Sequence, residues 1–183
     1  FHGGVAREDL THENLPALRV GLANLNRHIN NLRENYGVPA VVSINQFVSD
    51  TDAEVALVME HCNALGVKVA LSSHWANGGA GATDLAHMVA EICDADSTPA
   101  NRPHDSFVYS AELSLWEKLE AVATKVYHAS EITANTKGRD RIKELTDGGY
   151  GHLPVCIAKT PFSFSTDPAL KGAPTDHVMD IRE

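Results

Sequence analysis

The amino-acid sequence predicts an α/β fold, in which a mostly parallel sheet is flanked by helices and followed by a smaller α/β portion. Stretches with helical periodicity alternate with short stretches rich in Val and Ile, and the connections between them are short. The short stretches are apolar throughout, which is typical of strands buried on both faces of a parallel sheet. This alternation favours right-handed crossovers between parallel strands.

The first expected element is a helix that begins near Leu15. Asn14 suits its N-cap position, and Pro16 suits its first turn. Apolar residues recur three or four positions apart and predict one buried stripe. The stripe consists of Leu15, Leu18, Leu22, Leu25, Ile29 and Leu32.

Two strand–helix pairs follow. A strand at Val38–Asn45 leads into a helix starting near Thr51, where Thr51 and Glu54 have the spacing of a capping box. A second strand, Val67–Ser72, leads through a glycine-rich turn at 78–81 into a third helix. The side chains expected to face inward are Val55, Val58, Met59 and Cys62 in the second helix, and Leu85, Met88, Val89 and Ile92 in the third.

A polar, proline-containing connection at residues 94–105 divides the chain, so we expect a first α/β portion at residues 1–98 and a second at residues 99–183. The second portion should end in loops from residue 159 onward, because prolines are frequent there and periodicity is absent. Its expected regular elements are helices at 113–127 and 136–146 and strands at 131–134 and 154–158.

Composition and charge argue against a nucleic-acid partner and against membrane association. The formal net charge is −9 and the basic residues are scattered, which argues against a nucleic-acid partner. We expect no membrane association, because no stretch is long and apolar enough to cross a bilayer. The three cysteines, Cys62, Cys93 and Cys156, form no CxxC pair, and we expect reduced thiols in a cytoplasmic protein.

Two large aromatic residues follow the ends of the first two predicted strands. Phe47 comes after Asn45, and Trp75 comes after Ser72. Ligands of open parallel sheets bind beyond the carboxyl ends of the strands. The two rings are therefore candidates to stack on a flat heterocycle. The alternative is that both rings only cover the edge of the sheet.

Other groups of residues are weaker candidates for a functional site. The glycines at 78–81 precede a helix and could offer N–H groups to an anion, although a simple turn explains them equally. Asp50, Asp52 and Glu54 resemble an acidic metal cluster, but helix capping accounts for them. The sequence has neither HExxH nor a Cys/His pair at zinc spacing, so no bound metal is predicted.

Several segments resemble the signature segments of one enzyme family, and they occur in family order along the whole chain. They are residues 1–6 (FHGGVA), 44–51 (INQFVSDT), 75–81 (WANGGAG), 153–160 (LPVCIAKT), 162–168 (FSFSTDP) and 171–175 (KGAPT). Together these segments are specific, and the chain resembles the formate–tetrahydrofolate ligases. The resemblance implies a fold of the P-loop NTPase type.

The resemblance also implies a reaction for the intact protein. Formate attacks the γ-phosphate of ATP, with Mg²⁺, to give formyl phosphate, and the folate N10 amine takes the formyl group to give 10-formyltetrahydrofolate. Phe47 and Trp75 match the aromatic residues that hold the pterin ring. The positions that match nucleotide-binding segments are Leu71, Ser72, Ala173 and Pro174. No residue of this chain is assigned a catalytic role; the implied partners are these small molecules and other copies of the chain, because the family usually forms tetramers.

The chain departs from the family at Val48, where Pro is common, and at Asp176 and His177, where Gly and Phe are common. It starts at Phe1 rather than Met, so we expect an excised fragment, a processed chain or a single domain cut from a longer protein. The resemblance places the family's phosphate-binding loop upstream of Phe1. Phosphoryl transfer depends on such groups, and we expect no turnover from this chain alone. Two alternatives stay open: a module that binds pterin or nucleotide without turnover, and a structural piece with incomplete sites.

Overall fold

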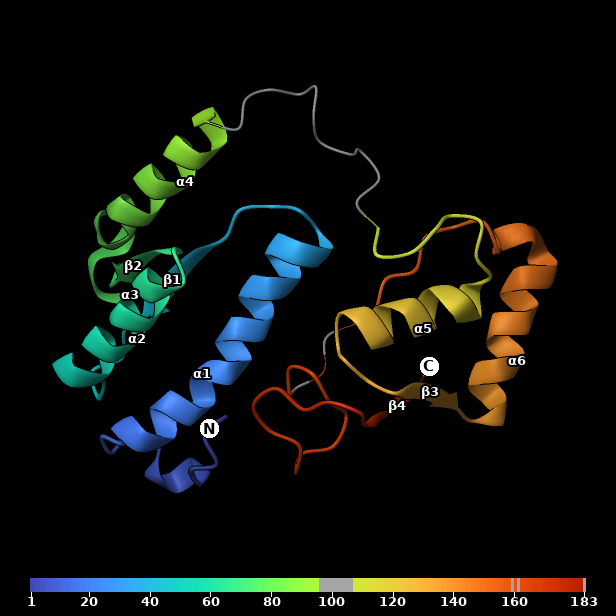
Figure 1. Ribbon diagram of the computed structural model, residues 1–183, viewed down its shortest axis with the longest axis horizontal. Helices are drawn as coiled ribbons and strands as arrows, with labels where there is room; N and C mark the ends of the chain where they lie inside the picture. The colour runs from blue at the N-terminus through green and yellow to red at the C-terminus, as the bar shows by residue number, and fades with distance from the viewer. Residues whose placement is uncertain (96–106, 159, 161, 183) are drawn as a thin grey trace. The chain divides into compact units, whose positions relative to one another are not determined.

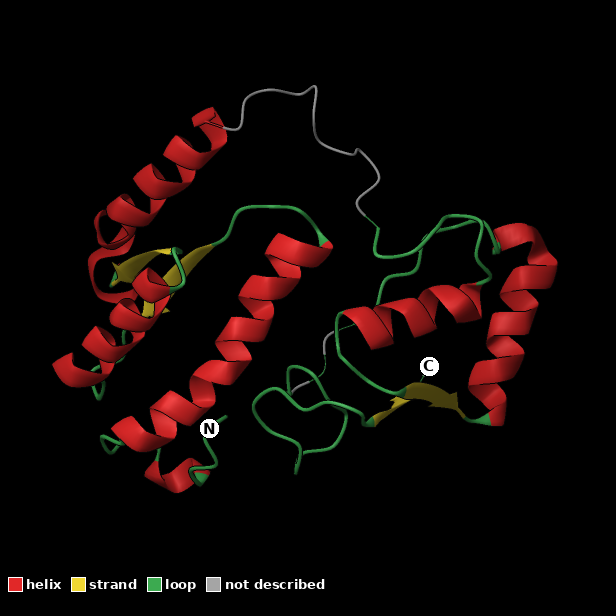
Figure 2. Ribbon diagram, in the orientation of Figure 1, coloured by secondary structure: helices red, strands yellow, loops and turns green. Residues whose placement is uncertain are grey.

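The computed structural model describes residues 1–95, 107–158, 160 and 162–182 (Figure 1). The chain is α/β, with helices and parallel strands, as the sequence predicts (Figure 2). It divides into two compact units. Unit 1 consists of Phe1–Arg33 and Gly37–His104, and unit 2 consists of Glu34–Tyr36 and Asp105–Glu183. The predicted boundary between residues 98 and 99 lies outside the described residues.

Unit 1 begins with α1 (Leu15–Asn30), and Asn14 caps it by accepting a hydrogen bond from the Ala17 N–H. Leu22 and Ile29 of the predicted stripe are buried. Leu32 is 41% exposed, so the prediction that it faces inward is wrong. The helix continues beyond Asn30 as a π-helical turn, Asn31–Asn35. Its i to i+5 bonding ends the α-helical spacing that would place Leu32 beside Ile29.

The sheet of unit 1 pairs β1 (Val41–Asn45) with β2 (Lys68–Ser72) in parallel. β1 begins three residues later than predicted, because Pro39 lacks an N–H for the ladder. β2 begins one residue later, since the Val67 N–H bonds to the Cys62 carbonyl. Between the strands lies α2 (Asp52–Ala64), which starts with the predicted capping box of Thr51 and Glu54.

The two strands differ in burial. β2 has three buried residues, whereas no described residue of β1 is fully buried. The expectation that β1 is covered on both faces is therefore wrong for these residues. Among the described helices, both α2 and α4 pack on β2, whereas α4 is the helix that packs on β1.

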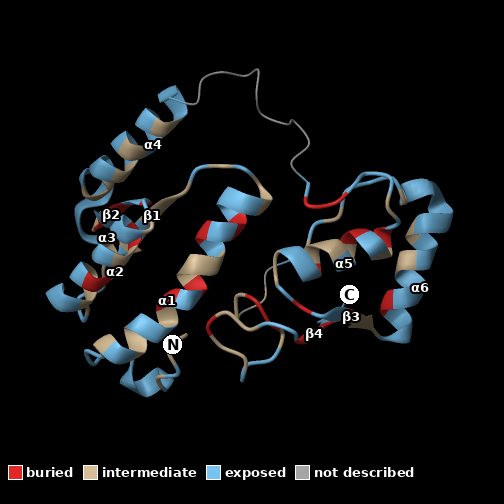
Figure 3. Cartoon of the chain, in the orientation of Figure 1, coloured by how far each residue is buried: buried red, intermediate tan, exposed pale blue. Residues whose placement is uncertain are grey.

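After β2 the chain forms a short helix α3 (His74–Asn77), a 3₁₀ helix (Gly78–Ala82) and then α4 (Thr83–Ala95). The glycines at 78–81 thus belong to a helical connection rather than to an open turn. None of the described residues of α4 is fully buried, and Val89 is 44% exposed, contrary to its expected inward position. Figure 3 shows the same mixture of half-buried and exposed residues along α4.

Unit 2 contains α5 (Leu115–Lys125), β3 (Glu131–Ala134), α6 (Thr136–Leu145), a π-helical turn (Thr146–Tyr150) and β4 (Val178–Ile181). The strands β3 and β4 pair in parallel. A capping box of Ser114 and Glu117 starts α5. The core of this unit consists of Ala123, Ala129, Ile132 and Met179.

Two predictions for the end of the chain are wrong. Residues 154–158 form no strand. The N–H of Val155 instead donates to the Tyr109 hydroxyl (2.9 Å), and that hydroxyl donates to the Val155 carbonyl (3.2 Å), so one side chain satisfies this backbone. The partner of β3 is β4, which lies in the stretch expected to consist of loops. β4 has four residues, too few to show a clear sequence pattern.

Candidate functional site

The candidate site lies at the carboxyl edge of the β1–β2 sheet in unit 1. The register places Asn45 beside Ser72, so both strands end at the same level. One further bond, from the Gln46 N–H to the Ser72 carbonyl (3.3 Å), continues the pairing beyond the strands. Phe47 and Trp75 follow within a few residues. The topology thus brings both predicted folate-binding residues to one edge, where ligands of parallel sheets bind.

Phe47 occupies the first position of a tight turn that ends at Asp50. The Asp50 N–H donates to the Phe47 carbonyl (3.1 Å), which closes the turn. The Phe47 N–H donates to the Asp50 carboxylate (2.8 Å), which closes it a second time. The Phe47 ring is 70% exposed. A large apolar ring is therefore held out in solvent on a doubly closed turn.

Trp75 lies in α3, directly after the strand end. Its indole Nε1–H donates to the carbonyl of Gln46 at 2.8 Å. Gln46 follows β1, whereas Trp75 follows β2, so the bond connects the ends of the two strands. The Trp75 side chain is 61% exposed. The hydrogen bond fixes the polar edge of the indole against the residue that precedes Phe47. Both rings are thus exposed apolar groups at the same edge of the sheet.

The end of β2 is held from the glycine-containing connection. The Ser73 N–H donates to the Gly81 carbonyl (3.0 Å). A Cβ on Gly81 would lie 2.6 Å from the Ser73 carbonyl carbon, so only glycine fits this approach. The Asn77 side chain donates to the Ser73 hydroxyl (2.9 Å). Gly81 and Asn77 therefore hold the backbone of Ser73, which leads into the helix that carries Trp75.

The four predicted nucleotide-binding residues are divided between the units. Leu71 is 38% exposed, whereas Ser72 is 1% exposed and its hydroxyl lies 2.8 Å from His74 Nδ1. The Ser72 hydroxyl thus faces a protein partner and not solvent. Ala173 and Pro174 belong to unit 2, where both are half-buried.

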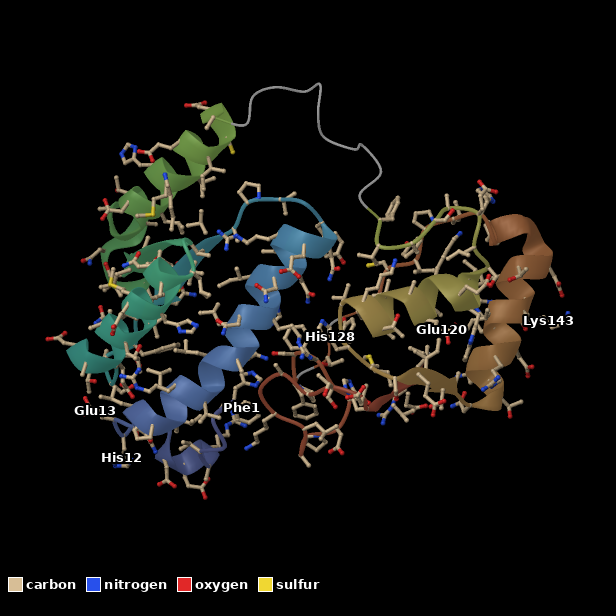
Figure 4. The ribbon with its side chains drawn as sticks, in the orientation of Figure 1. Phe1, His12, Glu13, Glu120, His128 and Lys143 are labelled. Carbon is tan, nitrogen blue, oxygen red and sulfur yellow. The ribbon has the colours of Figure 1, made fainter. Side chains whose placement is uncertain are left out.

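Two acidic residues near the site, Glu13 and Glu54, accept hydrogen bonds at the starts of α1 and α2. Glu54 accepts hydrogen bonds from the N–H groups of Thr51 and Asn14, each at 3.2 Å. The Thr51 hydroxyl donates to Glu13 (2.6 Å), which Figure 4 labels.

In the part of the chain that the structure describes, no three His, Cys, Asp or Glu side chains are grouped to hold a metal ion. Nor is any described helix long and apolar enough to cross a membrane.

A cavity of about 390 Å³ lies elsewhere in unit 1, among residues 1–12, α1 and α2. Its lining includes Leu10, Asn14 and Leu18, but none of the residues predicted to bind a ligand. Gly3 and Ala17 also line it, and Gly3 packs so closely on the Ala17 backbone that a Cβ has no room. The residues that the sequence predicts to bind a ligand therefore lie outside this cavity, at the edge of the sheet.

The sequence predicts Phe47 and Trp75 at one edge of the sheet, but it does not predict the groups that hold them there. Helix capping was the expected role of Asp50, whereas in the structure its carboxylate accepts the Phe47 N–H. A local signal for Asp50 exists, because an Asp three residues after Phe47 can close a turn on the Phe47 N–H. The Trp75–Gln46 bond has no such signal, since the two residues are far apart in the sequence.

Comparison with known proteins identifies the family. The family model described as formate–tetrahydrofolate ligase matches residues 1–183. Proteins named formate–tetrahydrofolate ligase are 54% identical in Methylococcus capsulatus, 48% in Pelagibacter ubique and 49% in Rhizobium etli. Each match covers 100% of this chain and 32% of the relative, so the chain spans about a third of the length of these relatives. The chain belongs to the formate–tetrahydrofolate ligase family.

Proposed function

We propose that the protein to which these residues belong joins formate to tetrahydrofolate with ATP, and that this segment supplies the folate-stacking half of the site. Family membership supports the reaction. The observation that carries the assignment of the half-site is the hydrogen bond from Trp75 Nε1 to the Gln46 carbonyl, because it ties one exposed ring to the backbone beside the other. In this proposal Phe47 and Trp75 contact the pterin.

The energetics fit a flat ligand. Offset stacking contributes about 0.5–1.5 kcal/mol per ring pair beyond the apolar area that it buries. Phe47 and Trp75 are 70% and 61% exposed, so both have much apolar area to bury against a ligand.

The further details of the reaction rest on family resemblance. We infer that ATP binds with Mg²⁺, that formyl phosphate is the intermediate, and that the protein is a cytoplasmic tetramer. Leu71, Ala173 and Pro174 are proposed to lie near the nucleotide through their exposed or half-buried surfaces. For Ser72 we propose an indirect role, since its buried hydroxyl is engaged with His74.

The test uses a full-length ligase in which these 183 residues form the corresponding segment. Phe47→Ala and Trp75→Ala should each raise KM for tetrahydrofolate by about tenfold, because about 1.4 kcal/mol of stacking and burial is lost. KM for ATP should stay within about twofold by the same argument. Tyr150→Ala is the matched control, since Tyr150 is an aromatic residue 54% exposed in unit 2. Equal losses for both substrates would instead indicate a folding defect.

A second experiment separates the binding module from a purely structural piece. The isolated 183-residue chain with Trp116→Phe retains Trp75 as its only tryptophan, because the sequence has two. A pterin stacked on the indole should quench its fluorescence, so saturable quenching by tetrahydrofolate indicates a binding-competent segment. Trp75 fluorescence that is unchanged by tetrahydrofolate, in a chain shown to be folded by circular dichroism, would support the structural reading.

A further inference from the structure

We propose that Asp50 and the indole N–H of Trp75 are positioning groups that hold Phe47 in place before the ligand binds. The inference rests on the proposed function of Phe47 and Trp75 and adds a residue, Asp50, to the site. Trp75 then has two roles. The face of its ring contacts the ligand, and its N–H holds Gln46 at the end of β1.

The first argument is the completeness of the hydrogen bonding around Phe47. The Gln46 N–H donates to Ser72, and the Gln46 carbonyl accepts from Trp75. The Phe47 N–H donates to the Asp50 carboxylate, and the Phe47 carbonyl accepts from the Asp50 N–H. All four backbone polar groups of these two residues therefore have partners, although the Phe47 side chain is exposed.

The second argument is that the tip of the turn is exposed. Val48, at the tip of the turn, is 87% exposed, and Ser49 is exposed as well. Burial therefore does not order the turn, and its shape depends on the hydrogen bonds at its base. Ordering a loop on binding reduces affinity, so bonds that order it beforehand favour the ligand.

The third argument is that Asp50 connects the turn to a rigid element. Thr51, the next residue, is the N-cap of α2, and its hydroxyl and N–H are engaged with Glu54. The Asp50 carboxylate thus reaches from the start of a capped helix back to the Phe47 N–H. A displacement of Phe47 requires either breaking this bond or uncapping the helix.

The test compares Asp50→Ala, Asp50→Asn and Trp75→Phe in the full-length ligase. Asp50→Ala removes the acceptor and should raise KM for tetrahydrofolate by about tenfold. Asp50→Asn retains an oxygen acceptor without the charge and should restore KM to within about twofold. Trp75→Phe keeps an aromatic face but loses the N–H, and should raise the same KM by about fivefold. Asp52→Ala is the control, because it removes an exposed carboxylate two residues away.

An independent readout separates this inference from the proposed function. Amide hydrogen exchange at Phe47 in the ligand-free protein should accelerate at least tenfold in Asp50→Ala and return to the original rate in Asp50→Asn. Unchanged exchange in Asp50→Ala would overturn the inference, as would an Asp50→Asn variant as impaired as Asp50→Ala, which would indicate a role for the charge. If Phe47→Ala leaves KM for tetrahydrofolate unchanged, the proposed function fails, while the exchange result still decides whether Asp50 holds the turn.

Discussion

Gly81 offers a sharp test of how the site is supported, because the structure quantifies the space around it. A Cβ at this position would lie 2.6 Å from the Ser73 carbonyl carbon and 2.7 Å from His74 N. The two backbone segments would have to separate by about 0.8 Å to reach ordinary contact. Both neighbouring atoms belong to backbone, so no flexible side chain can move aside.

The expected result for Gly81→Ala is a loss of about 2–4 kcal/mol in the free energy of unfolding. Strain from the inserted methyl group contributes about 1–3 kcal/mol. The weakened bond from the Ser73 N–H to the Gly81 carbonyl contributes about 1 kcal/mol more. Gly79→Ala is the matched control, because no described atom lies within 4 Å of its Cβ position. That variant should gain about 0.4–1 kcal/mol through reduced entropy of the unfolded chain.

The assay is urea unfolding of the 183-residue chain with Trp116→Phe, so that Trp75 fluorescence reports on unit 1. In the full-length ligase, Gly81→Ala should also raise KM for tetrahydrofolate, because His74 and Trp75 follow the displaced backbone. A Gly81→Ala variant as stable as Gly79→Ala would refute the reasoning. So would a destabilised variant in which KM for tetrahydrofolate stays unchanged.

Three further predictions follow from the structure. His177 is 8% exposed, and neither of its ring nitrogens has a hydrogen-bond partner among the described residues. His177→Phe should therefore raise the free energy of unfolding of unit 2 by about 1–3 kcal/mol in urea unfolding. The control His152→Phe, at an exposed position, should not. Burial raises the pKa of Tyr127, with Tyr36 and Cys156 adding to the effect, so the stability contributed by the neutral phenol is complete below about pH 10 and is lost as pH rises through the folded pKa. Tyr127→Phe should reduce this alkaline loss in circular dichroism, and an unchanged pH profile would contradict the assignment. The isolated chain should produce no 10-formyltetrahydrofolate from formate, ATP and Mg²⁺, and turnover near that of an intact ligase would show the expectation to be wrong.

The family departure at Asp176 and His177 acquires a physical meaning in the structure. Asp176 has a φ of 58°, a conformation that glycine adopts without strain and that Asp tolerates better than most residues. His177 fills a buried position that an apolar ring would fill without unpaired nitrogens. The resemblance implies Gly and Phe at these two positions, and those residues would suit both. The chain thus carries two locally unfavourable residues in succession.

Local features of this protein were determined by the sequence by itself. Asn14 as the cap of α1 and the capping box of Thr51 and Glu54 involve residues three positions apart. Interactions at that separation are readable from spacing, because the helix start defines the geometry. The parallel pairing of β1 and β2 was equally accessible, since a helix between two consecutive strands is the crossover connection that parallel strands need. Phe47 and Trp75 could therefore be assigned to one edge of the sheet.

Only the tertiary structure decided the features that depend on distant residues. β4 pairs with β3 across 47 positions, from Glu131 to Val178, and its four residues carry no pattern of their own. Residues 154–158 have the composition of a strand, but the Tyr109 hydroxyl satisfies the Val155 backbone in place of a neighbouring strand. The bond from Trp75 to the Gln46 carbonyl is of the same kind. Such contacts form because folding brings the chain segments together, and a hydrogen bond between distant residues leaves no periodic trace in the sequence.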